Sequence, residues 1–592
     1  MRGAATGTVE EALRLASRVL RDDPALAAEQ AREILKSAPR NADAFRLLGA
    51  ALRRTGEDEA AEQAELDAIS ASVHDPELMQ AAGALLDNDL PTVETILRQR
   101  LHDKPTDVAA IRMMAELAAR VGRYADSETL LRRALELAPG FAPARSNLAT
   151  VLYKQNRPAE AITVLDELQE MDADHVGDQN LKAAALGRIG SYEEAILVYE
   201  QVLNRLPDQP KVWMSYGHAL KTVGRQQDGI AAYRRALDLS PALGEVWWSL
   251  ANLKTVRFSD EDLAAMQAAL AGAELSREDR FHLHFALGRA FEERRDFEAS
   301  FDQYAKGNAL RGETVGFRIA ETDSLVERSK RLFTAAFFAA RAGHGCPAPD
   351  PIFILGMPRA GSTLVEQILA SHSLVEGTME LPDIALLVRR LDGGEGAYPD
   401  CLADLDGAAL AALGEEYLER TRIQRKTDRP FFIDKMPNNW AHAGFIRLIL
   451  PEAKIIDARR DPLDCCLSNF KQHYARGQGF SYSLTDMGRY YADYVALMAH
   501  FAGAMPSPPY RLVHERLIDE PEAEIRALLG FLCLPFEPSC LAFNETERAV
   551  RTASSEQVRR PINREGVGQW RTYEPWLDPL KQALGPALDA WQ

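Results

Sequence analysis

The sequence predicts a multidomain protein: an all-α array of helical hairpins, followed by an α/β domain with a mostly parallel sheet. Three observations predict this fold class. The chain has 592 residues, enough for several domains of roughly 100 to 200 residues each. A 34-residue period runs through the first half, which is typical of helical repeats. From Pro351 onward, short apolar runs alternate with helical stretches, as in domains with a parallel sheet.

The composition is that of ordinary globular domains, with 46% hydrophobic and 26% charged residues. This mixture excludes wholesale disorder and collagen-like or disulfide-dense classes. Lysine and arginine total 69 against 87 aspartates and glutamates, so the net charge is -18. Such an acidic chain is not expected to bind nucleic acid broadly, although a local basic pocket is compatible with it.

The sequence predicts a soluble, cytoplasmic protein without membrane insertion. Glu10 and Glu11 precede any apolar segment at the amino terminus, unlike the order of a secretory signal. No run of about 18 apolar residues, as a spanning helix needs, is present. All six cysteines lie in the second half without a CxxC pair, so we expect neither a structural metal nor a disulfide framework.

The repeat period is marked by turn residues and by helix-ending residues. Glycine or asparagine supplies a left-handed turn between two helices, and proline follows the second helix, so each period predicts a helix-turn-helix unit. The turn positions are Gly122, Asn156, Gly190 and Gly224, and Pro139, Ala173, Pro207 and Pro241 keep the same 34-residue step.

Small and large residues also recur within the periods, as in Trp213, Gly217, Leu220, Tyr233 and Ala236. This pattern resembles the tetratricopeptide repeat family. The resemblance is clearest over 105–255, and the predicted array covers 1–310. It implies a superhelix whose concave groove holds a peptide or partner protein. A scaffold or self-association surface is the alternative, and no groove residue is assigned.

Beyond the array, 311–347 is expected to be a helical linker, with one amphipathic helix over 318–343 and a proline-rich boundary after it. The second domain is predicted over 348–592. Its strands are expected at PIFILG (351–356), PFFID (430–434), AKIIDAR (453–459) and YRLV (510–513).

A phosphate-binding loop is predicted between the first strand and a helix that starts near Ser362. Gly356 and Gly361 allow the backbone N–H groups to point inward, toward the positive end of that helix. A nucleotidase loop would have lysine after Gly361, where Ser362 and Thr363 stand instead. The cation of this loop is Arg359.

A second strand-to-helix junction carries Arg460 and, eight residues later, Ser468. An arginine at a strand end and a hydroxyl two turns along the next helix can close on one phosphate from two sides. The alternative is that Arg460 pairs with Asp461 or Asp464.

Together these motifs resemble the sulfotransferases, in particular the tyrosylprotein sulfotransferase branch and its bacterial relatives with tetratricopeptide arrays, over 348–575. The resemblance implies 3′-phosphoadenosine 5′-phosphosulfate (PAPS) as donor and 3′-phosphoadenosine 5′-phosphate (PAP) as product. It assigns Arg460 and Ser468 to the 3′-phosphate. It assigns the loop residues Arg359, Ala360, Gly361, Ser362 and Thr363 to the 5′-phosphosulfate.

The resemblance also implies two further catalytic residues besides Arg359. Glu380, eight residues after His372, corresponds to the family's catalytic base. Alternatively, Glu380 opens the next helix ahead of Pro382. Lys435 corresponds to a lysine beside the leaving group, and a solvated loop lysine is the alternative.

The carboxyl-terminal segment is similar to the family's closing loop. Ser554 and Trp570 fit the family pattern, but Gln569 stands at a basic position. Arg564 is the candidate that supplies the missing charge, and an ordinary surface arginine is the alternative.

Three departures bear on the acceptor and the compartment. Pro382 replaces an arginine near the substrate of tyrosylprotein enzymes, and His514 replaces their tyrosine. Gly377 replaces a disulfide cysteine of the secreted branch, which agrees with a reducing compartment.

The expected activity is sulfuryl transfer from PAPS to a hydroxyl, namely tyrosine of a peptide or protein that the repeats recruit. A glycan, lipid or small metabolite is the alternative acceptor. No metal is expected, because a sulfuryl group carries less charge than a terminal phosphoryl group. Two other classes stay open: a nucleotidase or kinase, with Asp434 as its magnesium ligand, and an adaptor with an inactive transferase remnant.

Overall fold

The computed structural model describes residues 8–171, 177–392, 397–474, 477–546 and 557–592. Ala173 and Ser554, which the sequence analysis singles out, lie outside these ranges. The chain divides into two compact units, Met1–Arg205 and Leu206–Gln592. This division falls within the repeats, and the domain boundaries predicted from the sequence stay predictions.

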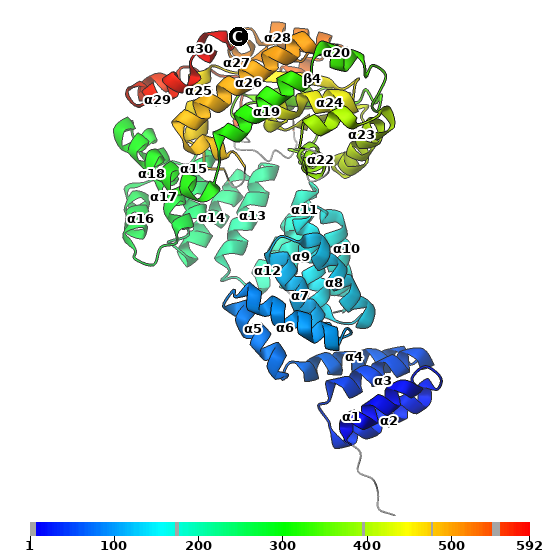
Figure 1. Ribbon diagram of the computed structural model, residues 1–592. Coiled ribbons are helices and arrows are strands. Elements are labelled where there is room, and N and C mark those ends of the chain that lie inside the picture. The colour runs from blue at the N-terminus through cyan, green and yellow to red at the C-terminus, as the bar shows by residue number, and fades with distance from the viewer. Residues whose placement is uncertain (1–7, 172–176, 393–396, 475–476, 547–556) are drawn as a thin grey trace, which may run out of the picture. The chain divides into compact units, whose positions relative to one another are not determined.

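The first unit consists of antiparallel helical hairpins, seen in blue and cyan in Figure 1. Gly122, Asn156 and Gly190 have φ values of 78°, 61° and 82°, so the predicted left-handed turns are confirmed. Its helices are α1 (Val9–Val19), α2 (Pro24–Ser37), α3 (Ala42–Thr55), α4 (Asp58–Ser72), α5 (Pro76–Leu86), α6 (Leu90–Asp103), α7 (Val108–Arg120), α8 (Tyr124–Leu137), α9 (Ala142–Lys154), α10 (Pro158–Met171), α11 (Gln179–Arg188) and α12 (Tyr192–Arg205).

The second unit begins with more hairpins of the same kind. Gly224 again has a left-handed φ, of 90°. A Cβ on Gly217 would lie 2.6 Å from Tyr233, and one on Gly288 would lie 2.8 Å from Tyr304, so the small residues do admit the large ones. These helices are α13 (Pro210–Val223), α14 (Gln226–Leu239), α15 (Gly244–Leu253), α16 (Asp260–Ala271), α17 (Arg277–Glu293) and α18 (Phe297–Val315).

The linker contains two helices where the sequence predicts one. Helix α19 (Ile319–Leu332) ends before Phe333, and the short α20 (Ala335–Ala339) follows it. The Thr334 side chain accepts a hydrogen bond from the Phe337 N–H at 3.2 Å. This cap starts a new helix, so the prediction of one continuous helix is wrong.

A five-stranded parallel sheet forms the centre of the second unit, in the order β2-β3-β1-β4-β5. Four of its strands are those predicted. The sequence misses β2, which has only three residues, too few for a pattern. The strands are β1 (Pro351–Gly356), β2 (Val375–Gly377), β3 (Phe431–Lys435), β4 (Lys454–Arg459) and β5 (Tyr510–Val513).

Helices cover both faces of the sheet. The α-helices are α21 (Ser362–Ala370), α22 (Asp383–Asp392), α23 (Gly407–Thr421), α24 (Ala443–Ile449), α25 (Pro462–Phe470), α26 (Leu484–Ala504), α27 (His514–Asp519), α28 (Pro521–Phe531), α29 (Asp578–Leu584) and α30 (Ala587–Ala590). The 3-10 helices are η1 (Asp400–Asp404), η2 (Arg422–Gln424), η3 (Pro437–His442), η4 (Gly479–Tyr482), η5 (Pro538–Cys540), η6 (Phe543–Glu545), η7 (Gln557–Arg559) and η8 (Gln569–Trp576).

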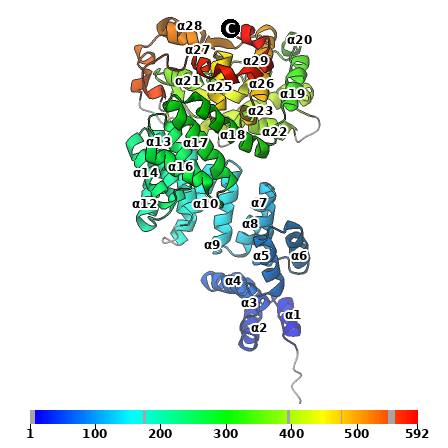
Figure 2. The same cartoon turned by 90° about the vertical axis from the view of Figure 1, so that its left-hand side faces the viewer.

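The core continues from the sheet into the last repeats. Successive strand residues point to opposite faces: Ile352 joins one hydrophobic cluster, and Phe353 joins the other. The cluster around Phe353 also contains Trp248 and Phe285 of the repeat helices. Figure 2 shows α13, α16 and α17 beside the α/β layer of this unit. The last repeats and the sheet therefore share one hydrophobic core.

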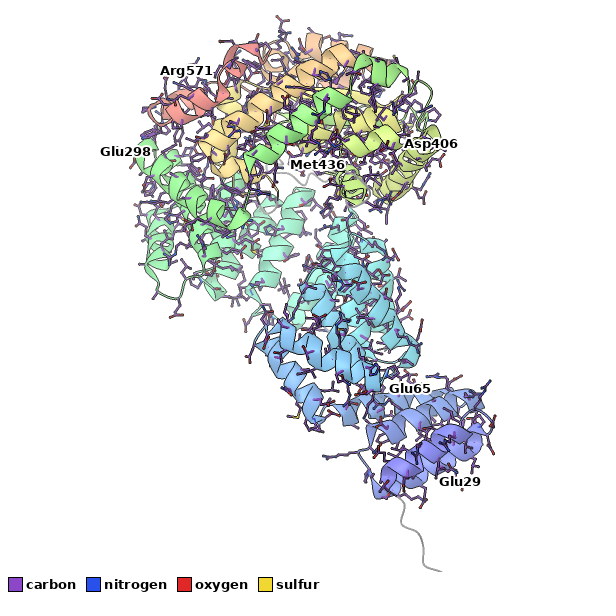
Figure 3. The ribbon with its side chains drawn as sticks, viewed as in Figure 1. Glu29, Glu65, Glu298, Asp406, Met436 and Arg571 are labelled. Carbon is purple, nitrogen blue, oxygen red and sulfur yellow. The ribbon has the colours of Figure 1, made fainter. Side chains whose placement is uncertain are left out.

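Charged side chains cover the outer surfaces, as Glu29 on α2 and Glu298 on α18 illustrate (Figure 3). Among the described residues, no helix is long and apolar enough to cross a membrane. All six cysteines are free thiols.

Candidate functional site

The loop after β1 has the curled backbone that the sequence predicts. Gly356 has φ 136°, and a Cβ there would lie 2.3 Å from the Ala458 carbonyl oxygen. Gly361 has φ 94° at the N-cap of α21, and its Cβ would lie 2.6 Å from His514 Nδ1. Both positions therefore require glycine, for conformation and for space. The loop ends at the positive end of α21, with Ser362 and Thr363 in its first turn.

The junction between β4 and α25 lies against this loop, because β1 and β4 are adjacent parallel strands. Arg460 donates from Nη1 to the Arg359 carbonyl at 2.9 Å and from Nη2 to the Gly566 carbonyl. Asp461 caps α25 by accepting from the Asp464 N–H at 2.9 Å. Arg460 thus binds carbonyls, in contrast to the alternative in which it pairs with Asp461 or Asp464.

Arg359 and Ser468 are in direct contact, since Arg359 Nε donates to Ser468 Oγ at 3.0 Å. The family resemblance assigns these residues to opposite ends of the donor, and that assignment stays a prediction. Any ligand that reaches both side chains must either share this hydrogen bond or replace it.

The closing segment is fixed to α25 by one buried carboxylate. Asp464 accepts from the Gly568 N–H at 2.6 Å and from the Trp570 N–H at 3.0 Å. Gln569, which stands at the family's basic position, has its side-chain oxygen 3.4 Å from Lys471 Nζ. Lys471 therefore brings a positive charge to the place where Gln569 lacks one.

Arg564 lies away from this place. Its guanidinium is exposed and pairs with Asp519. Arg560, four residues earlier, lines the cavity described next.

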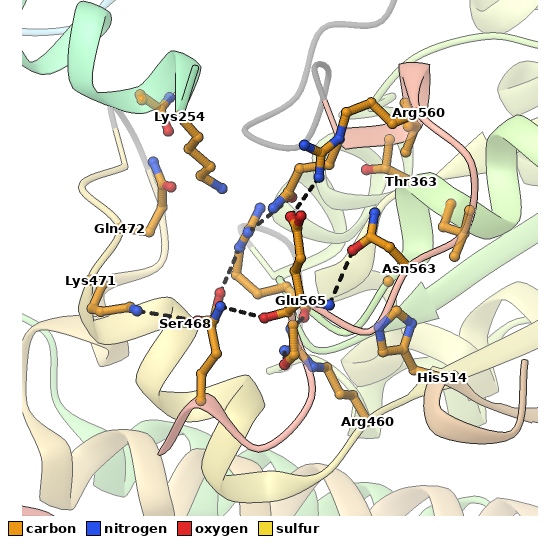
Figure 4. Close-up of a pocket in the computed structure, with 18 of the residues that line it drawn as sticks. Lys254, Thr363, Arg460, Ser468, Lys471, Gln472, His514, Arg560, Asn563 and Glu565 are labelled. Carbon is orange, nitrogen blue, oxygen red and sulfur yellow. Dashed lines mark hydrogen bonds and ion pairs between the residues drawn. The ribbon is translucent and has the colours of Figure 1, made fainter. Parts of the chain in front are cut away.

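A cavity of about 280 Å³ brings most of the predicted donor residues together (Figure 4). The predicted residues that line it are Arg359, Gly361, Ser362, Thr363, Arg460 and Ser468. Ala360 is buried and is not among its lining residues. Arg359 and Arg460 therefore face one and the same cavity.

The cavity is cationic although the chain is acidic. Among the described lining residues, six carry a positive charge and two carry a carboxylate. The cations are Lys254, Arg289, Arg359, Arg460, Lys471 and Arg560, and the carboxylates are Glu292 and Glu565. Burial and the nearby charge of Arg460 lower the pKa of Arg359. An anionic ligand would offset this excess of positive charge.

Several buried polar atoms of the cavity residues have no hydrogen-bond partner among the described residues: Asn252 Oδ1, Arg460 Nε and His514 Nδ1. Burial, together with Arg460 and Arg359, lowers the pKa of His514 to about 3, so the imidazole is neutral at pH 7. Because buried polar atoms are normally paired, these atoms fit a polar ligand. The residues present thus suit a phosphate-bearing molecule.

Glu380 and Lys435 form an ion pair at the end of β3. Lys435 Nζ lies 2.5 Å from Glu380 Oε1 and 3.9 Å from Glu366 Oε2. The Lys435 side chain is 1% exposed and that of Glu380 is 44% exposed, so Lys435 is not a solvated loop lysine. Neither residue lines the cavity. Helix α22 begins at Asp383, three residues after Glu380.

Asp434, the magnesium ligand that a nucleotidase or kinase would use, does not face the cavity. Its carboxyl group is buried and accepts a hydrogen bond from the Tyr417 hydroxyl at 2.8 Å. Burial raises the pKa of Asp434 well above its usual value. Within the described ranges, no group of three or more His, Cys, Asp or Glu residues could hold a metal ion.

Among the lining cations, sequence reasoning missed Lys254, Arg289, Lys471 and Arg560. The sequence could have indicated Lys471, because it follows Ser468 by one helical turn and so lies on the same face of that helix. Lys254 had no such signal, because it belongs to the repeats, about 100 residues before the loop.

Residues 351–538 match a family model described as "Sulfotransferase family", and residues 21–76, 118–185 and 180–243 match models described as "Tetratricopeptide repeat". An uncharacterised protein of Aquifex aeolicus is 34% identical over 342 residues, which are 56% of this chain and 45% of that protein. The alignment thus spans less than half of that relative's length.

Two relatives with named activities are more distant. Protein-tyrosine sulfotransferase 1 of Danio rerio is 25% identical over 41% of this chain and 74% of its own length. Protein-tyrosine sulfotransferase A of Caenorhabditis elegans is 23% identical over 39% of this chain and 64% of its own.

Among solved structures, the sulfotransferase domain of the Synechococcus PCC 7002 olefin synthase matches with a TM-score of 0.30 and 18% identity, over 39% of this chain and 90% of that one. The MamA protein matches with a TM-score of 0.26 and 16% identity, over 28% and 89%. The sequence matches show that this chain joins tetratricopeptide repeats to a domain of the sulfotransferase family.

Proposed function

We propose that the protein is a PAPS-dependent sulfotransferase that transfers a sulfuryl group to tyrosine of a peptide or protein. The observation that carries this proposal is the convergence of the β1 loop and the β4–α25 junction on one cationic cavity. A donor with phosphate groups at both ends of an adenosine needs several cations at close range. The lining cations exceed the carboxylates by four, comparable with the donor's negative charge.

In the proposed mechanism, the loop after β1, Arg359 and Lys435 act together in the transfer step. The sulfur–oxygen bond to the 5′-phosphate breaks as the acceptor oxygen bonds to sulfur, and the acceptor proton passes to Glu380. Backbone N–H groups of the loop and the positive end of α21 would hold the 5′ end. Arg359 and Lys435 would stabilise the charge that develops on the leaving oxygen.

The Glu380–Lys435 pair is not among the residues that line the cavity, and two observations support its proposed roles. Lys435 is held by a buried strand and has two carboxylates nearby. Glu380 is partly exposed, so an acceptor can reach it from solvent. A phenol with a pKa near 10 is about 0.1% ionised at pH 7, and a positioned base can contribute roughly 100- to 10,000-fold.

A polypeptide acceptor is supported by the repeats, which in other proteins commonly bind peptides, and by the two relatives named as protein-tyrosine sulfotransferases. The free thiols suit a reducing compartment such as the cytoplasm. Metal independence is part of the proposal.

The test uses thermal-shift titration of the full chain with PAP, and with ATP in the presence and absence of magnesium. We expect PAP to raise the melting temperature without magnesium. At a PAP concentration of 100 times its Kd, binding should add about 2.7 kcal/mol to the free energy of unfolding. Preference for ATP with magnesium would contradict the proposal. Radiolabelled PAPS added to a cell lysate then identifies the species that carries the sulfate.

Two variants separate binding from chemistry. Arg359→Ala is expected to abolish the PAP-dependent shift. Glu380→Gln is expected to keep that shift and to lower turnover at least about 100-fold. Turnover equal to that of the parent in Glu380→Gln would refute the assignment of Glu380 as base.

A further inference from the structure

Helix α15 ends one turn early compared with the preceding repeat. It begins at Gly244, 34 residues after the start of α13 at Pro210, but it ends at Leu253, only 30 residues after the end of α13 at Val223. The residues that would complete the last turn form a loop that leads to Ser259, the N-cap of α16. The early end lies beside the cavity, whose lining includes Asn252 and Thr255.

Lys254 occupies the C-cap of α15 in a left-handed conformation, with φ 63° and ψ 1°. The corresponding C-cap of α13 is Gly224. Glycine is favoured at such caps because a side chain is strained there. A lysine at this position is therefore unfavourable for the helix itself, and such strain is a reason to look for a functional role.

The side chain of Lys254 points from the end of α15 into the cavity, on the side of Ser468 and Lys471 (Figure 4). The positive charges of Arg359, Arg289 and Lys471 act on its ammonium group. Burial and these charges lower the pKa of Lys254 well below its usual value. A phosphate group among these cations would reverse that effect.

The repeats that carry Lys254 are fixed to the transferase residues of the same unit. Lys471 Nζ pairs with Glu292 of α17 at 2.7 Å. Asn308 of α18 donates to the Phe470 carbonyl at 2.9 Å. Phe301 stacks on Trp576 with ring centroids 5.2 Å apart. Lys254 is thus presented to the cavity by a packed interface.

We propose that Lys254 is a donor-binding residue that contacts the phosphate group held beside Ser468, so that the last repeats form one wall of the donor site. This inference rests on the proposed function, in which Ser468 and Arg460 bind the 3′-phosphate. The repeat array then takes part in donor binding in addition to any recruitment of an acceptor.

The test is isothermal titration of the full chain with PAP and with adenosine 5′-monophosphate, which lacks the 3′-phosphate. Lys254→Gly is expected to weaken PAP binding about tenfold, as for loss of one charge-assisted hydrogen bond. Binding of the monophosphate should change less than twofold. The melting temperature without ligand should stay the same or rise, because glycine suits the left-handed cap.

Arg295→Gly is the matched control. Arg295 is also a cationic residue with a left-handed φ, 62°, after a repeat helix, but it is exposed and is not a lining residue. It should bind both nucleotides as the parent does. Lys254→Asn, which also tolerates this conformation, provides a second variant.

Unchanged PAP affinity in the Lys254 variants, or an equal loss for both nucleotides, would overturn the inference. Failure of the parent protein to bind PAP would instead overturn the proposed function. The two failures are therefore distinguishable.

Discussion

Two separate constraints, one on conformation and one on space, require glycine at position 361. Its φ of 94° is strained for other residues, and any Cβ would meet His514 Nδ1 at 2.6 Å. His514 itself stands at the end of β5 and lines the cavity. The loop can therefore approach the end of β5 only through glycine, and this approach sets the distance between the loop and the β5 end of the cavity.

We predict that Gly361→Ala destabilises the protein by about 1–3 kcal/mol and weakens PAP binding at least tenfold. The control is Gly316→Ala, which has a left-handed φ of 63° but no atom within 4 Å of its Cβ. It should cost about 1 kcal/mol and leave binding unchanged. Denaturant unfolding and PAP titration measure both effects, and equal PAP affinity in the two variants would contradict the prediction.

Glu380 has two roles in the proposal, as the counter-charge of Lys435 and as the base. A lysine that is 1% exposed needs a counter-charge, and Glu380 supplies it in the donor-free protein. When a donor binds, Lys435 would gain a third anionic partner besides Glu380 and Glu366, and Glu380 would be released toward the acceptor proton. In the proposed mechanism, the ion pair would couple donor binding to the availability of Glu380 as the base.

At the level of elements, the sheet brings together segments that are distant in sequence. The site residues follow the carboxyl ends of β1, β3, β4 and β5, and in a parallel sheet these ends share one edge. The strand order places β1 between β3 and β4. This order accounts for the contact of the Arg359 loop with Arg460.

The sequence could predict these junctions because each is a local pattern. An apolar strand, a glycine-bounded turn and a capped helix leave a signal within about 20 residues, as at Gly356–Gly361 and at Arg460–Ser468. The turns at Gly122 and Asn156 are local in the same sense, and they too are confirmed.

Features that depend on tertiary packing could not be predicted. Arg560 and Arg564 lie in a segment without periodicity, so the sequence does not show which of them faces the cavity. The early end of α15 at Lys254 is marked by no glycine or proline in the sequence. The break at Thr334 was missed because one threonine is a weak signal within an amphipathic run.

The positions of the lining residues in the chain predict which helices the donor site needs. All described residues that line the cavity come after Leu206, beginning with Trp248. Deletion of residues 1–205 should therefore leave PAP affinity within twofold of the parent. Deletion of residues 1–347 should give aggregated protein, because Trp248 and Phe285 belong to the core of the sheet. Size-exclusion chromatography, circular dichroism and PAP titration test both deletions. PAP binding lost in the first, or a folded monomer in the second, would contradict this expectation.

At the scale of the whole molecule, the charge of the cavity opposes that of the chain. A net charge of -18 repels an anionic donor at long range, but salt screens charges beyond about 8 Å. Within the cavity the lining cations dominate, because partly buried charges are screened less. The acidic surface therefore does not conflict with the proposed binding of an anionic donor at physiological ionic strength.

Buried histidines tie the stability of the second unit to pH. His473 and His282 have ring centroids 4.6 Å apart, and His473 also contacts Phe281 and Phe285. Burial lowers the pKa of His473 to about 2, with His282 and Arg311 acting in the same direction. Burial also lowers the pKa of His282 to about 4, reinforced by Arg311 and opposed by Asp279. Both imidazoles are therefore neutral in the folded protein at pH 5.

In the unfolded chain these histidines take up protons near pH 6.5, so between about pH 6.5 and 4 the unfolded state binds more protons than the folded state. The contribution of these two histidines to the free energy of unfolding therefore falls as the pH falls through this window. The Asp493–Asp323 carboxyl pair works in the opposite direction, because burial and the neighbouring carboxylate raise the pKa of Asp493 to about 7.

The decisive measurement is therefore a comparison between the parent and His473→Phe, which keeps an aromatic ring but cannot titrate. We expect the free energy of unfolding of the variant to rise relative to that of the parent as the pH falls, by about 1.4 kcal/mol per pH unit at most. Thermal melts at pH 7.5, 6.0 and 5.0 measure this difference. A constant difference between the two proteins would mean that His473 is protonated in the folded state as readily as in the unfolded chain, which its surroundings of Trp248, Phe281 and Phe285 oppose.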